Sequence, residues 1–197
     1  MYEYIRGELT GITPTDAIVE CGGIGYDLNI SLSTFSTLQN SVGKEVKLFL
    51  YHKVSEDDEQ LFAFADKDER VVFTHLISVS GVGSASAQMI LSSMTAEETR
   101  EAILTNDVNR FKAVKGIGLK TAQRIILELK DKIGKGSDVQ FTFADAGSSS
   151  AIREEALTAL TLLGFSKPAV EKVLASVLKE HPDCTIEELI KRCLKML

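Results

Sequence analysis

Two short passages of the chain repeat one another and combine residue types that can hold a phosphate group. Each places two glycines around one apolar residue, as Gly81-Val82-Gly83 and Gly116-Ile117-Gly118, and each continues with Ala-Gln-x-Ile. Glycine permits positive φ and close backbone approach, while the central apolar residue can anchor the turn in a core. The N–H groups that start the following helix are unpaired, and the helix dipole favours an anion there. The repeat therefore predicts two helix-hairpin-helix motifs that bind phosphate through the backbone.

A single Gly-apolar-Gly turn can also be a tight connection between helices that binds nothing. The repetition, with matching continuations, favours the binding interpretation. Neither copy is a nucleotide-binding loop, because both lack the GxxxxGK[ST] pattern and the third glycine of GxGxxG, and because helices precede them. Gly23-Ile24-Gly25 fails the same tests, and we interpret it as a strand turn or bulge.

The sequence offers no pattern that indicates catalysis. Its histidines are isolated from one another, and no serine or cysteine lies in a recognisable nucleophile elbow. The acids cluster only in the run from Glu56 to Glu59. Four consecutive acids on one loop cannot all converge on one metal ion, so a solvated turn is the simpler interpretation of that run. The odd number of cysteines, without a CxxC pair, predicts buried thiols at Cys21, Cys184 and Cys193 and neither disulfides nor a zinc site.

Charge is distributed unevenly along the chain. The formal net charge is -6, which by itself argues against a nucleic-acid partner. Residues 1–64 contain four bases against ten acids, whereas residues 110–132 contain seven bases against two acids. The local excess of bases, which includes the second glycine repeat, is a better guide to the partner than the average.

Residues 1–64 have the pattern of a small β-barrel. Segments that alternate or run apolar between turn residues predict five strands, and residues 33–38 fit a short helical connection. Five short strands in about sixty residues fit an oligonucleotide/oligosaccharide-binding (OB) type barrel. The predicted strands are Tyr4–Leu9, Ala17–Cys21, Gly25–Ile30, Glu45–Leu50 and Leu61–Phe64.

The remaining sequence predicts further domains, so we expect a multi-domain chain. Residues 65–134 have helical periodicity with caps at Asp66 and Thr95, which predicts an all-α domain around the two repeats. Residues 135–150 are rich in glycine and serine and predict a flexible linker. Residues 151–197 predict a three-helix mini-bundle of marginal stability, which should present apolar surface to a partner. Because no apolar stretch could cross a bilayer and no leader is recognisable at the start, we expect a cytoplasmic protein.

Taken in order over the whole chain, these motifs resemble the RuvA family. The resemblance depends on the five-strand segment, the loop Ser55-Glu56-Asp57, the S-G-V-G and K-G-I-G-L-K-T-A hairpins, the Gly/Ser linker and the terminal L-L-G-F helices. Members of this family are Holliday-junction recognition subunits of the bacterial RuvA–RuvB branch-migration complex. The resemblance implies a non-catalytic DNA-binding protein of recombination, DNA repair and the SOS response. It implies binding to four-way junction DNA and recruitment of the hexameric RuvB ATPase motor, with the RuvC resolvase as a further partner.

The resemblance also implies an assembly and the roles of particular residues. Residues 1–64 would form a tetramerisation domain, and the homotetramer would bind a junction alone or as two stacked tetramers. Glu56 and Asp57 match the family's acidic pin at the crossover. No cofactor is implied for this chain, since ATP and Mg are used by the motor. The implied motor-binding residues are Leu163, Phe165 and Leu194, and the implied DNA-binding residues are Gly81, Val82, Gly83, Ser84, Lys115, Gly116, Ile117, Gly118, Lys120, Thr121 and Arg124.

The chain departs from the family pattern at a few positions near the hairpins. Ser84 and Ala85 stand where the family often has a proline and a lysine, and Leu119 replaces a frequent lysine. Phosphate binding is therefore expected to depend more on backbone amides and on Lys115, Lys120 and Arg124. Two other functions stay open from the residues alone: a general duplex-binding scaffold, and a fragment of a nuclease or ligase, for which the sequence lacks a carboxylate or nucleophile constellation.

Overall fold

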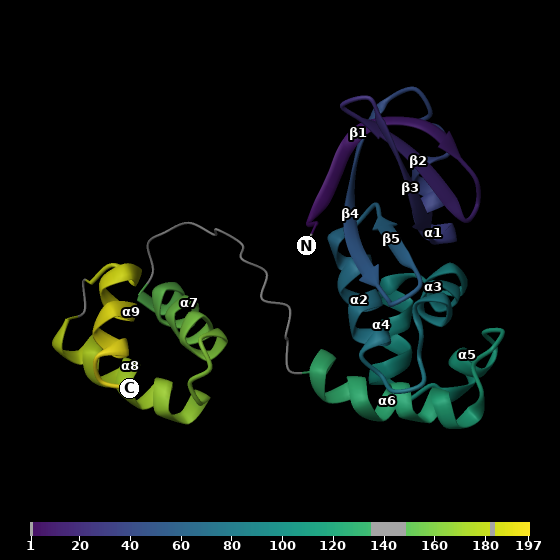
Figure 1. Ribbon diagram of the computed structural model, residues 1–197. Coiled ribbons are helices and arrows are strands. Elements are labelled where there is room, and N and C mark those ends of the chain that lie inside the picture. Colours follow the sequence, from purple (N-terminus) through teal and green to yellow (C-terminus); the bar gives the residue numbers. More distant parts are fainter. Residues whose placement is uncertain (1, 135–148, 182–183) are drawn as a thin grey trace. The chain divides into compact units, whose positions relative to one another are not determined.

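The computed structural model describes residues 2–134, 149–181 and 184–197, and the chain divides into two compact units, residues 1–137 and 138–197 (Figure 1). Most of the predicted linker, residues 135–148, lies outside the described residues. Its last two positions belong instead to a helix that begins at Ser149, two residues earlier than the predicted start of the mini-bundle.

Residues 2–64, all of which are described, form a closed five-stranded barrel in the order β1-β2-β3-β5-β4, with β4 paired back to β1. Neighbouring strands are antiparallel except β3 and β5, which are parallel. Helix α1 (Leu32–Leu38) connects β3 to β4, as expected for a barrel of the OB type. The strands are β1 (Tyr4–Ile12), β2 (Asp16–Cys21), β3 (Ile24–Ile30), β4 (Glu45–Val54) and β5 (Glu59–Phe64).

Alternating residues of these strands fill the barrel. Leu9, Val19 and Leu28 are fully buried, and they form one cluster with other apolar residues of the barrel. A Cβ atom on Gly7 would collide with the backbone carbonyl of Glu20, so β1 can approach β2 this closely only with glycine at that position.

The second part of this unit is helical and lies against one end of the barrel (Figure 1). Asp66 caps the first helix and Thr95 forms a capping box, as predicted from the sequence. Phe62 and Phe64 of β5 pack on Phe73, with ring centroids 5.1 and 5.0 Å apart, which continues the apolar contact from the barrel into the helices. The helices are α2 (Lys67–Ile77), α3 (Ser84–Ser93), α4 (Ala96–Leu104), α5 (Val108–Lys112) and α6 (Leu119–Gly134).

The described helices of the other unit are α7 (Ser149–Leu162), α8 (Lys167–Glu180) and α9 (Ile186–Leu194), which surround a core of their own. Cys184 and Cys193 are buried in this unit, as predicted, but Cys21 in the barrel is exposed, so the prediction of three buried thiols was wrong at that position. Among the helices that the structure describes, none is long and apolar enough to span a bilayer.

Candidate nucleic-acid interface

The two glycine repeats form turns of matching geometry. Gly81 lies between α2 and α3 and Gly116 between α5 and α6, and both have φ of +89°. The residue after each glycine donates a backbone hydrogen bond back across the turn, from Val82 to Val79 at 3.0 Å and from Ile117 to Val114 at 3.1 Å. Because φ in this range is strained for side chains with a Cβ, the turns require glycine at these two positions.

The second glycine of each repeat starts a helix with an open approach. Ala87 donates to the carbonyl of Gly83 and Ala122 to that of Gly118, both at 2.9 Å, so α3 and α6 begin at equivalent places. Gly83 provides no side-chain cap, and a Cβ at Gly83 or Gly118 would meet nothing within 4 Å. The N–H groups of the first helical turn are therefore accessible to a ligand, and the helix dipole favours an anionic one.

The other predicted residues of the hairpins divide into anchors and exposed groups. Val82 and Ile117 are buried in the helical core and hold the turns in place. Ser84 is the first residue of α3 and Thr121 lies in the first turn of α6, and both are half-buried. These two hydroxyl-bearing residues lie beside the accessible N–H groups.

Lys115 and Lys120 flank the second turn as free cations. Both are exposed, and neither takes part in a hydrogen bond or ion pair within the described part of the chain. Most of the other bases between residues 110 and 132 already have a hydrogen-bond partner, so in this described segment Lys112 and these two lysines are the bases without one. The engaged bases are Arg110 with Glu101, Arg124 with Ser80, Lys130 with Asn106, and Lys132 with Ser78.

Arg124 faces the first hairpin although it belongs to the second. Its Nη1 donates to the backbone carbonyl of Ser80 at 3.1 Å, and its Nε lies 3.7 Å from Oε1 of Glu128. The family resemblance placed Arg124 among the DNA-binding residues. Its contact with the other hairpin, 44 residues away, could not be predicted from the repeat.

Glu56 and Asp57 are exposed at the tip of the hairpin between β4 and β5. The backbone N–H and the hydroxyl of Ser55 both donate to the carbonyl of Asp58 at 2.8 Å, which closes the tip after the last strand pair. Glu59 differs from its neighbours because its carboxylate contacts Nε2 of His52 at 2.5 Å. The four acids therefore do not act as one cluster, and in the described residues no group of three or more ligating side chains could hold a metal ion.

The predicted motor-binding residues of the C-terminal unit differ in exposure. Leu163 is 62% exposed and Leu194 is 42% exposed, whereas Phe165 is half-buried against the bundle's core. Leu162, Met196 and Leu197 are also exposed, at 69%, 58% and 36%. Leu162 ends α7 directly before Leu163, so it could have been included with the predicted residues of this turn.

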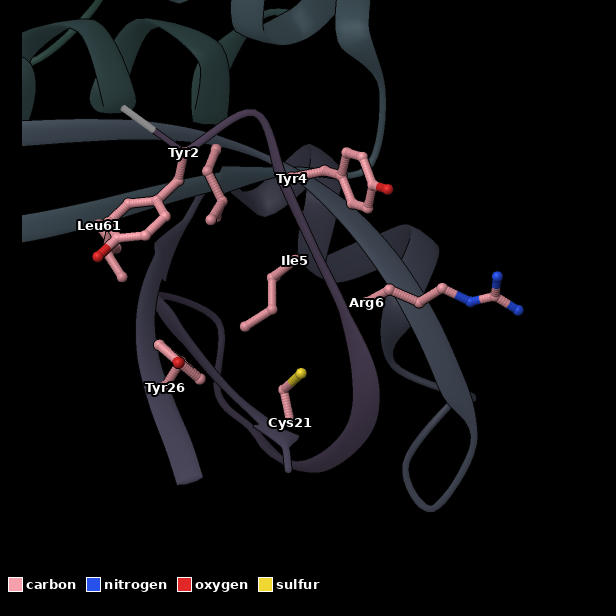
Figure 2. Close-up of a pocket in the computed structure, with 8 residues that line it drawn as sticks. Tyr2, Tyr4, Ile5, Arg6, Cys21, Tyr26 and Leu61 are labelled. Atoms are coloured by element: carbon pink, nitrogen blue, oxygen red, sulfur yellow. The ribbon is translucent and has the colours of Figure 1, made fainter. Parts of the chain in front are cut away.

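A pocket of about 300 Å³ opens at one end of the barrel (Figure 2). Its lining is mostly apolar and aromatic, and the Arg6 guanidinium points away from it toward Glu45, to which it donates at 2.9 and 2.6 Å. The pocket thus offers no free charge to a phosphate. Its lining residues are Tyr2, Tyr4, Ile5, Arg6, Cys21, Tyr26, Leu50 and Leu61.

Comparison with known families matches nearly the whole chain. Residues 1–63 match the RuvA N terminal domain, residues 73–131 match a SAM-like helix-hairpin-helix tandem, and residues 151–197 match the RuvA C-terminal domain.

Similar proteins align over their full length and that of this chain. They include proteins of Bacteroides thetaiotaomicron at 47% identity, Porphyromonas gingivalis at 44% and Cytophaga hutchinsonii at 47%, each with 100% of both chains covered. All three are named Holliday junction branch migration complex subunit RuvA.

Proposed function

Because this chain belongs to the RuvA family, we propose that it is a non-catalytic subunit that binds four-way DNA junctions and recruits the hexameric RuvB ATPase motor. The observation that carries this proposal is the pair of matched hairpins, each with accessible N–H groups at a helix start. Groups of this kind contact the DNA backbone and carry no base readout, so binding is independent of sequence.

The DNA contacts are assigned to the hairpin turns and the helix starts that follow them. Backbone amides of both hairpins hold phosphates, and Lys115 and Lys120 add charge at the second hairpin. Val82 and Ile117 support the turns from the core. The proposed set is Gly81, Val82, Gly83, Ser84, Lys115, Gly116, Ile117, Gly118, Lys120 and Thr121, with Arg124 beside it.

Glu56 and Asp57 are assigned to an acidic pin. Carboxylates at an exposed hairpin tip repel phosphates, which favours an open crossover over a continuous duplex. These two acids set the preference for junctions and contribute no binding energy of their own.

We assign a separate role in the assembly to each segment of the chain. The barrel, residues 1–64, associates into a homotetramer that binds a junction alone or as a pair of tetramers, and residues 65–134 hold the DNA arms. Residues 151–197 dock the motor through Leu163, Leu194 and the side of Phe165 that is not buried. RuvC is assigned as a further partner on the junction. The site of action is the cytoplasm, where the DNA partner lies.

A competition between DNA shapes tests the function. Binding to a labelled four-way junction is competed with unlabelled linear duplex of the same base composition, and then repeated with a junction of unrelated sequence. We expect the junction to be strongly preferred, with equal affinity for both sequences and a steep decrease as salt rises. Lys120→Ala should weaken both junctions equally. Equal competition by linear duplex would indicate a general duplex-binding module instead, and a marked difference between junction sequences would exclude backbone recognition.

A further inference from the structure

The side chain of Arg124 connects the two hairpins by a hydrogen bond to a backbone carbonyl oxygen. No side-chain substitution at the accepting residue removes that oxygen. The Arg124 guanidinium donates to the backbone carbonyl of Ser80, the residue that immediately precedes Gly81 in the first turn. Hydrogen bonds from a charged donor are stronger than those between neutral groups. The contact therefore joins the start of α6, where the second hairpin presents its N–H groups, to the turn of the first.

A second contact joins the same pair of elements farther along α6. Nζ of Lys132 donates to the hydroxyl of Ser78 at 3.0 Å, and Ser78 is the residue that ends α2. Apart from the shared apolar core, α6 packs mainly against α4 and α5 rather than against the first hairpin. The two polar contacts thus add directional links where the packing between the hairpins is sparse.

Arg124 already contacts two other groups of the protein, unlike the two free lysines. One N–H of its Nη1 donates to the Ser80 carbonyl, and the carboxylate of Glu128 lies beside its Nε. The neighbouring Glu128 reduces the positive potential that a phosphate would meet there. Lys115 and Lys120, in contrast, have no partner within the described residues.

We propose that Arg124, assisted by Lys132, is a positioning residue that sets the orientation of the first phosphate-binding turn relative to the second. This inference rests on the proposed function, because it concerns the same two turns. When two binding sites are held at the spacing of their ligands, binding at the first site raises the effective concentration of ligand at the second. A loosely connected pair of sites has a lower effective concentration and therefore a lower affinity. Arg124 then contributes to affinity through geometry, while the lysines contribute through charge.

Amide hydrogen exchange on the full chain without DNA measures the geometric role directly. The probe is the N–H of Val82, which is hydrogen-bonded across the first turn, and the internal reference is the equivalent N–H of Ile117 in the second turn. Arg124→Ala should speed exchange at Val82 roughly fivefold, as expected for the loss of one hydrogen bond, and leave Ile117 near the wild-type rate. Arg124→Lys keeps a cationic donor and should stay close to wild type.

Lys130→Ala is the matched control, because Lys130 is also a base on α6 but its Nζ donates to Asn106 and not to the first hairpin. It should leave exchange at Val82 unchanged. Unchanged exchange at Val82 in Arg124→Ala would overturn the proposal. So would an equal increase in Lys130→Ala, which would indicate a general loosening of the domain.

The salt dependence of junction binding separates positioning from phosphate contact. Arg124→Ala should lower the affinity at every salt concentration without changing the slope of log affinity against log salt, whereas Lys120→Ala should reduce the slope. A slope reduced in Arg124→Ala as in Lys120→Ala would make Arg124 a phosphate ligand and overturn the proposal. If the wild-type chain failed to bind junctions, the proposed function would fail, while exchange at Val82 would still decide whether Arg124 orients the turn.

Discussion

The buried carboxyl group of Glu69 accepts a hydrogen bond of 2.8 Å from the hydroxyl of Thr34. Thr34 lies on α1 of the barrel and Glu69 on α2, the helix that leads into the first hairpin. Ser31, the N-cap of α1, donates to the other carboxyl oxygen, and the Thr34 hydroxyl accepts from the N–H of Ala65 at 3.0 Å. This small polar network joins the barrel to the DNA-binding helices, and all of its members are hydrogen-bonded.

The network makes stability depend on pH in a predictable direction. Burial raises the pKa of Glu69 above its ordinary value of 4.5, and the hydrogen bonds from Ser31 and Thr34 offset this only in part. The folded state therefore binds the proton more tightly than the unfolded state. The resulting stabilisation is full below the unfolded pKa and is lost as the pH rises through the folded pKa.

Glu69→Gln should remove this dependence of stability on pH. The unfolding free energy of the variant should therefore fall less than that of the wild type as the pH rises from 4.5 toward neutrality. Urea denaturation at a series of pH values measures it. Glu98→Gln is the control of opposite sign, because hydrogen bonds from Thr95 lower the pKa of Glu98 and its contribution is lost as the pH falls. Parallel pH profiles for wild type and Glu69→Gln would contradict the prediction.

The positive φ of Gly116 predicts a graded response to substitution. Gly116→Ala should cost about 1–2 kcal/mol, because a Cβ strains this backbone conformation even though the space around it is open. Gly116→Asn should cost less, since asparagine tolerates left-handed backbone. Urea denaturation gives the stabilities, and junction affinity should decrease in the same order. Equal losses for the two variants would contradict a requirement for glycine that is set by φ.

Local signals in the sequence predicted the hairpins and the caps, but tertiary contacts were not predictable. Asp66 and Thr95 were identifiable as caps because capping depends on residues within one turn. The bounds of helix α5 were not predicted, since five residues are too few to display a period. Cys21 follows the inward alternation of β2, yet it is exposed because the strand ends there, at the pocket by the open end of the barrel.

The role of Arg124 shows the same limit at the candidate site. The charge pattern marked it as one base among seven between residues 110 and 132. Its contact with the carbonyl of Ser80 depends on how the two hairpins fold together, and a backbone acceptor has no sequence signature. Free and engaged bases could therefore be distinguished only in the structure.

Removing the charge of the hairpin tip tests the acidic pin. The double variant Glu56→Gln, Asp57→Asn should raise affinity for linear duplex severalfold and leave junction binding in place, because these exposed acids repel phosphate and hold no structure. Competition assays with both DNA shapes measure this. Glu8→Gln with Glu20→Gln removes the same charge from exposed barrel positions paired between β1 and β2. A similar gain in this control would attribute the effect to net charge, and a loss of junction binding by the first variant would contradict its assignment.

A chain truncated after Gly134 should bind junctions as the whole chain does but fail to stimulate the motor. The cores of the barrel and of the hairpin helices consist of residues up to Ile133, and the C-terminal unit has a separate core. Residues 151–197 contain seven bases and seven acids, so they provide little net attraction for DNA. Junction affinity and the ATPase rate of the motor, measured together, separate the two roles.

A single substitution in the full chain makes the same test without removing a unit. Leu163→Ser changes an exposed side chain, so the bundle should keep its helical circular dichroism while motor stimulation decreases, as expected when an apolar anchor is lost from an interface. Leu157→Ser is the folding control, because Leu157 packs against the bundle's core and its loss should unfold α7 to α9. Wild-type motor stimulation by the truncated chain would contradict the assignment of residues 151–197. Loss of junction binding in step with motor stimulation would show instead that the two units do not have separate roles.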